Sequence, residues 1–383
     1  MSLVVRSCRT IDQPLEYINS GIDWDTLDVT NKVKFPEEYS WPVGTGGNAD
    51  IYLAELDGKV VAVKVPRYYG MDDEDKSVLI KKIKREIGIW ARLCHSRVLP
   101  FIGYCSFLYG PSEMSTFSLV SPWMRNGTIS NYVHRYQNAD VSSLLIEVCE
   151  GLEYLHAQNI VHGDLKPSNV FISDDGHAVL ADFGNSRSVE ALIPPLDGLN
   201  NVDLSHACGT SRYMAPELFE ASAASSSTAA DIWALGCVLL EIGVRALPYE
   251  SCKGDAQVMP SIMNRKLPYQ QTEEDFLEQK IRLLFRWSWQ FGQTYYHKRG
   301  IGAICSRCWE TCPLSRPRIS TIARWLIDLR DESLSFHEMS WRNWEDELRR
   351  IIERRIKAIV PWEANASGRS HGVPTLHSLD TDE

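Results

Sequence analysis

The sequence His162-Gly163-Asp164-Leu165-Lys166-Pro167-Ser168-Asn169 is followed thirteen residues later by Asp182-Phe183-Gly184. Together these stretches place two carboxylates, an amide and an ammonium at spacings that suit phosphoryl transfer from a metal–nucleotide complex. That reaction requires mainly positioning and charge stabilisation from a protein. An Asp-Phe-Gly by itself occurs often and indicates only a turn, but the two motifs in this order favour a catalytic function.

Four polar side chains in these stretches have distinct predicted roles. Asp164 faces and deprotonates the attacking hydroxyl. Asp182 and Asn169 offer oxygen ligands that hold Mg²⁺ against the phosphates. Lys166 neutralises charge on the phosphoryl group in transfer.

On these motifs, the chain resembles the eukaryotic protein kinases over roughly residues 39–332. The resemblance implies an α+β, bilobal fold with a small β-rich N-lobe, which holds one long helix, and a large α-helical C-lobe. It also implies an ATP-dependent serine/threonine kinase that uses Mg²⁺ and acts on protein hydroxyls. Cys308-Trp309 and the motif style are similar to the tyrosine-kinase-like group, and Asp28-Val29-Thr30 resembles fungal members.

The resemblance and the local composition predict the order of segments along the chain. The segments are a lead-in over 1–38 expected to follow the surface, an N-lobe over 39–121, a hinge over 122–126, a C-lobe over 127–332 with an aromatic-rich insertion around 269–300, a helical extension over 333–360 and a disordered tail over 361–383.

Bulk properties narrow the class of protein. The 383 residues are 44% hydrophobic and 23% charged, as is usual for a soluble globular protein. The net charge of −10 argues against nucleic-acid binding. The start of the chain lacks a signal-peptide pattern, and the most apolar run, Ile232 to Ile242, is too short to span a bilayer. Ten scattered cysteines favour reduced thiols, so we expect a cytoplasmic protein, with the nucleus as the alternative.

One cysteine cluster, Cys305-x-x-Cys308-x-x-x-Cys312, is a candidate metal site. The spacing puts all three side chains on one face of a helix, where cysteine behaves as a small apolar residue. Zinc is the alternative, but no fourth ligand lies nearby in sequence. Core packing is therefore the prediction.

Periodicity predicts the main elements. Residues 51–53 and 60–63 read as strands joined by a turn at Asp57-Gly58. Residues 72–93 read as a helix with one apolar face. Further helices are expected in the C-lobe, the insertion and the extension, over 142–157, 229–244, 276–291, 319–330 and 341–360.

The resemblance also implies a nucleotide site. Gly44-Thr45-Gly46-Gly47 form a loop whose backbone amides approach phosphate oxygens, although Ala49 replaces the third glycine of the family pattern. Lys64 contacts the α/β-phosphates, and Glu86 is its partner, since an unpaired buried ammonium is costly.

Adenine is expected between Ile51 and Ala62 on one side and Phe171 on the other. Ser121-Pro122-Trp123-Met124 resembles the kinase hinge, with Met124 as the N–H donor because Pro122 has none. The resemblance places Ser121, a small residue, at the entrance to the pocket behind the adenine site.

Outside the nucleotide site, the family pattern pairs Glu217 with Arg316 and makes Asp231 the carboxylate that holds the catalytic loop. The main departure is Gly163, where most kinases carry an arginine that binds a phosphate on the activation loop. We therefore expect little dependence on phosphorylation at Ser205, Thr210 or Ser211, with Arg187 and Arg212 as partial substitutes.

The functional alternatives are a pseudokinase that acts as a nucleotide-binding scaffold and a metabolic small-molecule kinase. Inactive relatives usually lack at least one of the residues that bind nucleotide and metal or act in catalysis. All five of these residues are present here: Lys64, Glu86, Asp164, Asn169 and Asp182. Small-molecule kinases generally lack both Ala215-Pro216-Glu217 and the Gly209-Thr210 substrate platform. The extension's amphipathic helix either docks on its own lobe or binds a partner, as the insertion also could.

Overall fold

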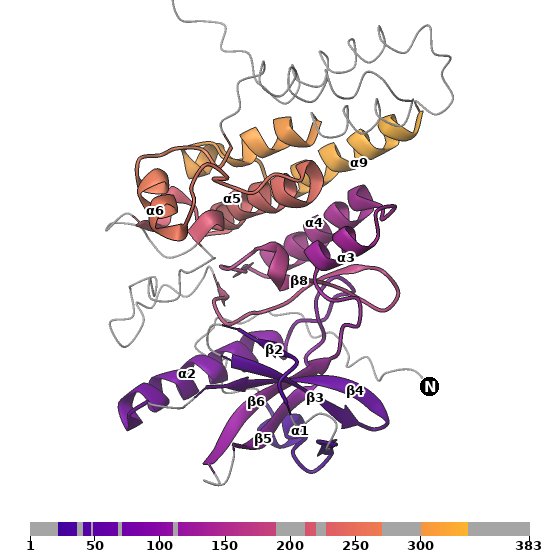
Figure 1. The fold of residues 1–383 in the computed structure, drawn as a ribbon, viewed down its shortest axis with the longest axis vertical. Helices are drawn as coiled ribbons and strands as arrows, with labels where there is room; N and C mark the ends of the chain where they lie inside the picture. Colours follow the sequence, from indigo (N-terminus) through magenta and orange to yellow (C-terminus); the bar gives the residue numbers. More distant parts are fainter. Residues whose placement is uncertain are drawn as a thin grey trace, which may run out of the picture.

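Figure 1 presents the computed structural model, which describes residues 22–36, 41–46, 49–67, 71–109, 114–188, 211–219, 227–269 and 300–335. The predictions for the body of the insertion, the C-terminal extension and the tail lie outside the described residues, as do Gly47, Gly209 and Thr210. Within the described ranges, no helix has both the length and the apolar character needed to cross a membrane.

The N-terminal half is an antiparallel sheet with one long helix beside it (Figure 1). Its strands are β1 (Val33–Lys34), β2 (Gly44–Thr45), β3 (Ala49–Leu56), β4 (Lys59–Pro66), β5 (Gly103–Tyr109) and β6 (Met114–Pro122). The order across the sheet is β1-β3-β4-β6-β5, and β2 also pairs with β3. This arrangement confirms the predicted β-rich lobe.

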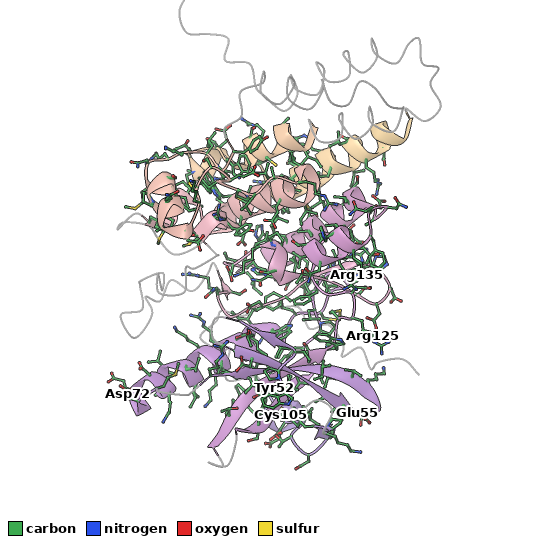
Figure 2. All side chains as sticks on the ribbon, in the orientation of Figure 1. Tyr52, Glu55, Asp72, Cys105, Arg125 and Arg135 are labelled. Atoms are coloured by element: carbon green, nitrogen blue, oxygen red, sulfur yellow. The ribbon has the colours of Figure 1, made fainter. Side chains whose placement is uncertain are left out.

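The β3–β4 hairpin forms as its sequence predicts. Asp57 and Gly58 both have positive φ, of 49° and 74°, which a two-residue turn between twisted strands requires. Alternate side chains of the two strands are buried, and Tyr52 packs in the same cluster as Cys105 of β5 (Figure 2).

The long helix is α2 (Asp73–Trp90). Asp72 caps it, because its side chain accepts a hydrogen bond from the Asp75 N–H at 2.8 Å. Ile83, Ile87 and Trp90 are buried, so the predicted apolar face is confirmed. The helix ends at Trp90, slightly earlier than the predicted residue 93.

The C-terminal half is helical, which confirms the predicted bilobal fold. Its helices are α3 (Ile129–Arg135), α4 (Val141–Ala157), α5 (Thr228–Leu239), α6 (Asp255–Met263), residues 300–308 and α9 (Ile319–Ser335), with α9 packed along α4. Two small antiparallel pairs contact the helices of this half, β7 (Ile160–Val161) with β10 (Arg187–Ser188) and β8 (Val170–Ile172) with β9 (Ala178–Leu180).

Helix α5 is buried on all sides and organises this lobe. The predicted single helix over 229–244 instead changes to a π-helical segment at Leu240–Val244. Gly236 permits close packing, since a Cβ there would lie 2.7 Å from both the Cβ of Cys308 and the Nε1 of Trp309.

The core-packing prediction is confirmed for Cys305 and Cys308, which are buried, but it is wrong for Cys312. Helix 300–308 ends before Cys312 is reached, so this cysteine is exposed and precedes a 3₁₀ turn at Pro313–Ser315.

The lead-in is not confined to the surface. Residues 24–27 form helix α1 (Trp24–Leu27), and Leu27 and Val29 are 5% and 7% exposed. The Val29 N–H donates to the carbonyl of Tyr104 at 2.9 Å. Gly103 makes this contact feasible, because a Cβ there would lie 2.3 Å from the Leu27 carbonyl oxygen. The prediction of a surface path is therefore wrong for this part of the segment.

Backbone hydrogen bonds join the N-terminal half to the C-terminal half. The Leu99 N–H donates to Leu180 at 2.8 Å, and the Leu180 N–H donates to Arg97 at 2.9 Å. On α4, Gly151 leaves room for this junction, since a Cβ would lie 2.7 Å from the Arg97 oxygen. The segment between α2 and β5 is thereby tied to β9, the strand that leads into Asp182.

Candidate active site

Lys64 joins three separate elements. It lies on β4 opposite Ile51 of β3. Its Nζ is 3.0 Å from Glu86 Oε1 on α2 and 2.8 Å from Asp182 Oδ1. The predicted Lys64–Glu86 pair is thus observed, and one ammonium connects the sheet, the long helix and the Asp-Phe-Gly segment.

The electrostatics of this cluster follow from burial and charge. Burial opposes the ammonium form of Lys64, but Asp182 and Glu86 outweigh it and raise the pKa of Lys64. The Lys64 charge lowers the pKa of Asp182 to about 2. Burial raises the pKa of Glu86, with Lys64 acting in the opposite direction. Asp182 is therefore an ionised carboxylate at neutral pH, as a metal ligand must be.

Asp164 has one oxygen engaged and one without a partner. Its Oδ2 accepts hydrogen bonds from Lys166 Nζ at 2.8 Å and from Asn169 Nδ2 at 3.2 Å. Its Oδ1 is buried and has no hydrogen-bond donor among the described residues. Burial raises the pKa of Asp164, and Lys166 opposes that shift. A desolvated carboxylate oxygen without a donor suits a hydroxyl that must be oriented and deprotonated.

The loop that carries Asp164 is held by Asp231 of α5, which is 2% exposed. Asp231 accepts hydrogen bonds from the His162 N–H at 2.8 Å and the Gly163 N–H at 2.9 Å. The ring of His156 lies 2.9 Å from the same carboxylate. The prediction that Asp231 holds the catalytic-loop backbone is confirmed.

Gly163 not only lacks the arginine side chain of most kinases; the local backbone also requires glycine at this position. Its φ is +79°, and a Cβ would lie 2.6 Å from the carbonyl oxygen of Asn185. The next residue, Ser186, donates from Oγ to the His162 carbonyl at 2.8 Å. The catalytic loop and the segment after Gly184 are therefore fastened directly to each other. Sequence analysis gave Asn185 and Ser186 no role.

Asn169 and Asp182 meet the requirements for metal ligands. Asn169 Nδ2 donates to the Asp164 carbonyl at 2.8 Å, so Oδ1 is the side-chain oxygen left for a metal. Asp182 has φ +65°, a strained conformation of the kind that concentrates at functional sites. Its side chain is 41% exposed. The described residues contain no group of three or more His, Cys, Asp or Glu side chains that could hold a metal ion. Phosphate and water would therefore complete the coordination of Mg²⁺ beside Asp182 and Asn169.

The predicted nucleotide-binding residues lie on the strands and the connector beside Lys64. Gly44 and Thr45 pair with β3, and Ser121 of β6 pairs with Ala62 of β4. The half-buried side chains expected to face adenine are those of Ile51, Ala62 and Phe171.

The connector after β6 leaves the predicted adenine donor available. The Met124 carbonyl accepts the Gly127 N–H at 3.0 Å. Within the described part of the chain, the Met124 N–H donates to no protein acceptor, which is consistent with donation to adenine. The roles of these residues stay predictions.

The family's structural ion pair is present. Arg316 Nη1 and Nη2 donate to the two carboxylate oxygens of Glu217 at 2.6 and 2.8 Å. The guanidinium also lies over the ring of Trp233, 5.0 Å from its centroid. Glu217 ends the segment that Asp182 begins, so this pair anchors that segment to the C-lobe.

Arg212 is not available as a substitute for the missing arginine. Its guanidinium donates to the carbonyls of Pro248, Tyr249 and Cys252 at 2.8 to 3.2 Å, and Asp255 lies 3.6 Å away. The predicted role for Arg212 is therefore wrong, because this side chain already binds the segment that precedes α6.

Comparison with known proteins agrees with this geometry. A family model described as the protein kinase domain matches residues 38–325. Serine/threonine-protein kinase TNNI3K of Mus musculus is 28% identical over 293 residues, which cover 75% of this chain and 30% of TNNI3K. Serine/threonine-protein kinase STY46 of Arabidopsis thaliana is 28% identical over 217 residues, covering 56% of this chain and 34% of STY46. MST11 of Pyricularia oryzae, a mitogen-activated protein kinase kinase kinase, is 27% identical over 255 residues, covering 63% and 26%.

These relatives come from an animal, a plant and a fungus, and they do not support a specifically fungal affinity. The chain spans about a third or less of the length of each relative. The family match nevertheless covers most of this chain and includes every site residue described above. The chain belongs to the protein kinase family.

Proposed function

We propose that the chain is a protein serine/threonine kinase that transfers the γ-phosphoryl group of Mg·ATP to protein hydroxyls. The observation that carries this proposal is the state of Asp164: one carboxylate oxygen is held by Lys166 and Asn169, and the other is buried without a donor among the described residues. A scaffold that only bound nucleotide would have no use for this arrangement.

Each polar residue then has one task. Asp164 orients the acceptor hydroxyl and accepts its proton, while Lys166 neutralises developing charge. Lys64 binds the α/β-phosphates and is positioned for them by Glu86. Asp182 and Asn169 would hold Mg²⁺, which supplies charge neutralisation to the phosphates when bound.

The two alternatives are less well supported. A pseudokinase typically lacks at least one of the polar groups, whereas Lys64, Glu86, Asp164, Asn169 and Asp182 are all present. A small-molecule kinase would not need the segment that Glu217 and Arg316 anchor. The relatives named above are protein kinases, which supports a protein acceptor.

The acceptor residue is tested directly. The full chain is incubated with Mg·[γ-³²P]ATP and a generic protein substrate, and the labelled product is hydrolysed for phosphoamino-acid analysis. Lys166 follows the base by two residues, as in serine/threonine kinases, so we expect phosphoserine and phosphothreonine. Mainly phosphotyrosine would contradict the assignment of acceptor class.

Regulation by the activation loop is expected to be weak. Gly163 supplies no guanidinium, Arg212 is engaged elsewhere, and the catalytic loop is already held by the hydrogen bond from Ser186 to the His162 carbonyl. Of the proposed phosphorylation sites, Ser211 is fully buried, while Ser205 and Thr210 lie outside the described residues. Arg187 remains the candidate partner for a phosphate there.

Phosphatase-treated enzyme, with dephosphorylation verified by intact mass, should therefore keep most of its activity toward an added substrate. A hundredfold loss, equal to about 2.7 kcal/mol in barrier height, that rephosphorylation of this loop restored would overturn this expectation. Control would instead come from the insertion, the C-terminal helix or a partner, and the proposed location is the cytoplasm, with the nucleus as the alternative.

A further inference from the structure

Arg67 contacts the glycine-rich loop at three points, and sequence analysis gave it no role. It lies directly after β4, three residues beyond Lys64. Its Nε is 3.1 Å from Asp50 Oδ1. Its Nη2 donates to the Gly46 carbonyl and, at 3.4 Å, to the Ala49 carbonyl. All three acceptors belong to the loop between β2 and β3 or to the start of β3.

The burial of Asp50 and the several acceptors of Arg67 indicate a fixed arrangement. The Asp50 side chain is 9% exposed and that of Arg67 is 39% exposed. A buried carboxylate needs a charged partner, and a guanidinium can bind several acceptors at once in a fixed plane. A lysine at this position could neutralise Asp50 but could not serve both carbonyls with the same geometry.

The same contacts also fix the loop's hydrogen-bonded turn. The Gly46 N–H donates to the Ala49 carbonyl at 2.8 Å, and Arg67 binds the carbonyls of both residues. By binding both carbonyls, Arg67 holds the backbone where the loop leaves β2 and where it enters β3. Backbone N–H groups are what such a loop offers to phosphate oxygens.

We propose that Arg67 and Asp50 are positioning residues that hold the glycine-rich loop in the conformation that binds the nucleotide phosphates. This inference rests on the proposed kinase function. Neither residue needs to touch the nucleotide: Asp50 attracts the guanidinium as its counter-charge, and the guanidinium orients the loop backbone. Arg67 and Asp50 therefore contribute to the binding of the phosphates and not to the binding of adenine.

The test separates phosphate binding from adenosine binding. Calorimetry with Mg·ADP and with adenosine is carried out on the wild-type chain and on Arg67→Gln, Arg67→Lys and Asp50→Asn. We expect Arg67→Gln to weaken Mg·ADP binding about tenfold, a change of about 1.4 kcal/mol, while adenosine affinity stays within about twofold. Arg67→Lys should fall between Arg67→Gln and wild type. The double variant of Arg67→Gln with Asp50→Asn should lose less than the sum of the two single losses, because the residues act as a unit.

Arg330→Gln is the matched control, since Arg330 pairs with the exposed Asp331 on α9, away from the loop. Unchanged Mg·ADP affinity in Arg67→Gln would overturn the inference. So would an equal loss for Mg·ADP and adenosine, which would mean that Arg67 only supports the fold. A wild-type chain that bound neither ligand would instead refute the kinase function itself, so the two failures are distinguishable.

Discussion

Asp164→Asn should reduce kcat by roughly two to four orders of magnitude and leave Mg·ATP affinity nearly unchanged. Asparagine keeps the shape of the side chain and can still accept hydrogen bonds from Lys166 and Asn169. It cannot take the proton of the acceptor hydroxyl. The buried Oδ1 of Asp164 therefore loses its function while the surrounding loop, held by Asp231, keeps its backbone contacts.

Steady-state kinetics on a generic substrate, combined with nucleotide binding by calorimetry, measure both quantities. Asp182→Asn is the contrasting variant: it removes the carboxylate that Lys64 keeps ionised, so Mg·ATP binding should weaken together with turnover. If Asp164→Asn phosphorylated the substrate at the wild-type rate, the assignment of Asp164 as the base would be wrong.

Glu217→Ala should lower the free energy of unfolding by about 3–5 kcal/mol. Arg316 has a side chain only 1% exposed, and it pairs with Glu217 through both carboxylate oxygens. Removing the carboxylate leaves a buried guanidinium without a counter-charge, although the carbonyls of Glu310 and Ala229 remain as acceptors. Urea denaturation with linear extrapolation measures the loss.

Glu310→Ala provides the matched control, because it removes a glutamate that pairs with Arg307 at a more exposed position. A partly exposed ion pair of this kind contributes about 1 kcal/mol, so Glu310→Ala should lose much less stability than Glu217→Ala. Equal stability of Glu217→Ala and wild type would show that the pair does not anchor the activation segment.

The parts of the fold that sequence predicted well are those determined by local spacing. The Asp57-Gly58 turn requires two residues that tolerate positive φ, and these residues specify it. The apolar stripe of α2 likewise specifies which of its faces is buried. The Lys64–Glu86 pair was predicted from a family pattern and is observed, whereas the contact between Lys64 and Asp182 was not predicted.

The features that sequence missed depend on contacts between distant parts of the chain. Leu27 is buried because Gly103 lets its carbonyl approach, and nothing in residues 22–34 alone signals that contact. The prediction that Arg212 binds phosphate failed because no local pattern indicates its three carbonyl acceptors, which lie 36 to 40 residues further along the chain. Arg67 could have been noticed as a cation shortly after Lys64, with an acidic residue in the glycine-rich loop, but its geometry needed the structure.

The most direct test of the central claim asks whether the nucleotide-saturated wild-type chain transfers phosphate. The chain is first titrated to saturation with Mg·ATP, and phosphorylated residues on the chain itself and on an added substrate are then mapped by mass spectrometry. An active kinase should yield phosphoserine and phosphothreonine that disappear in EDTA and in Asp164→Asn. Saturation with nucleotide but no phosphate transfer would contradict the account and identify the chain as a nucleotide-binding scaffold.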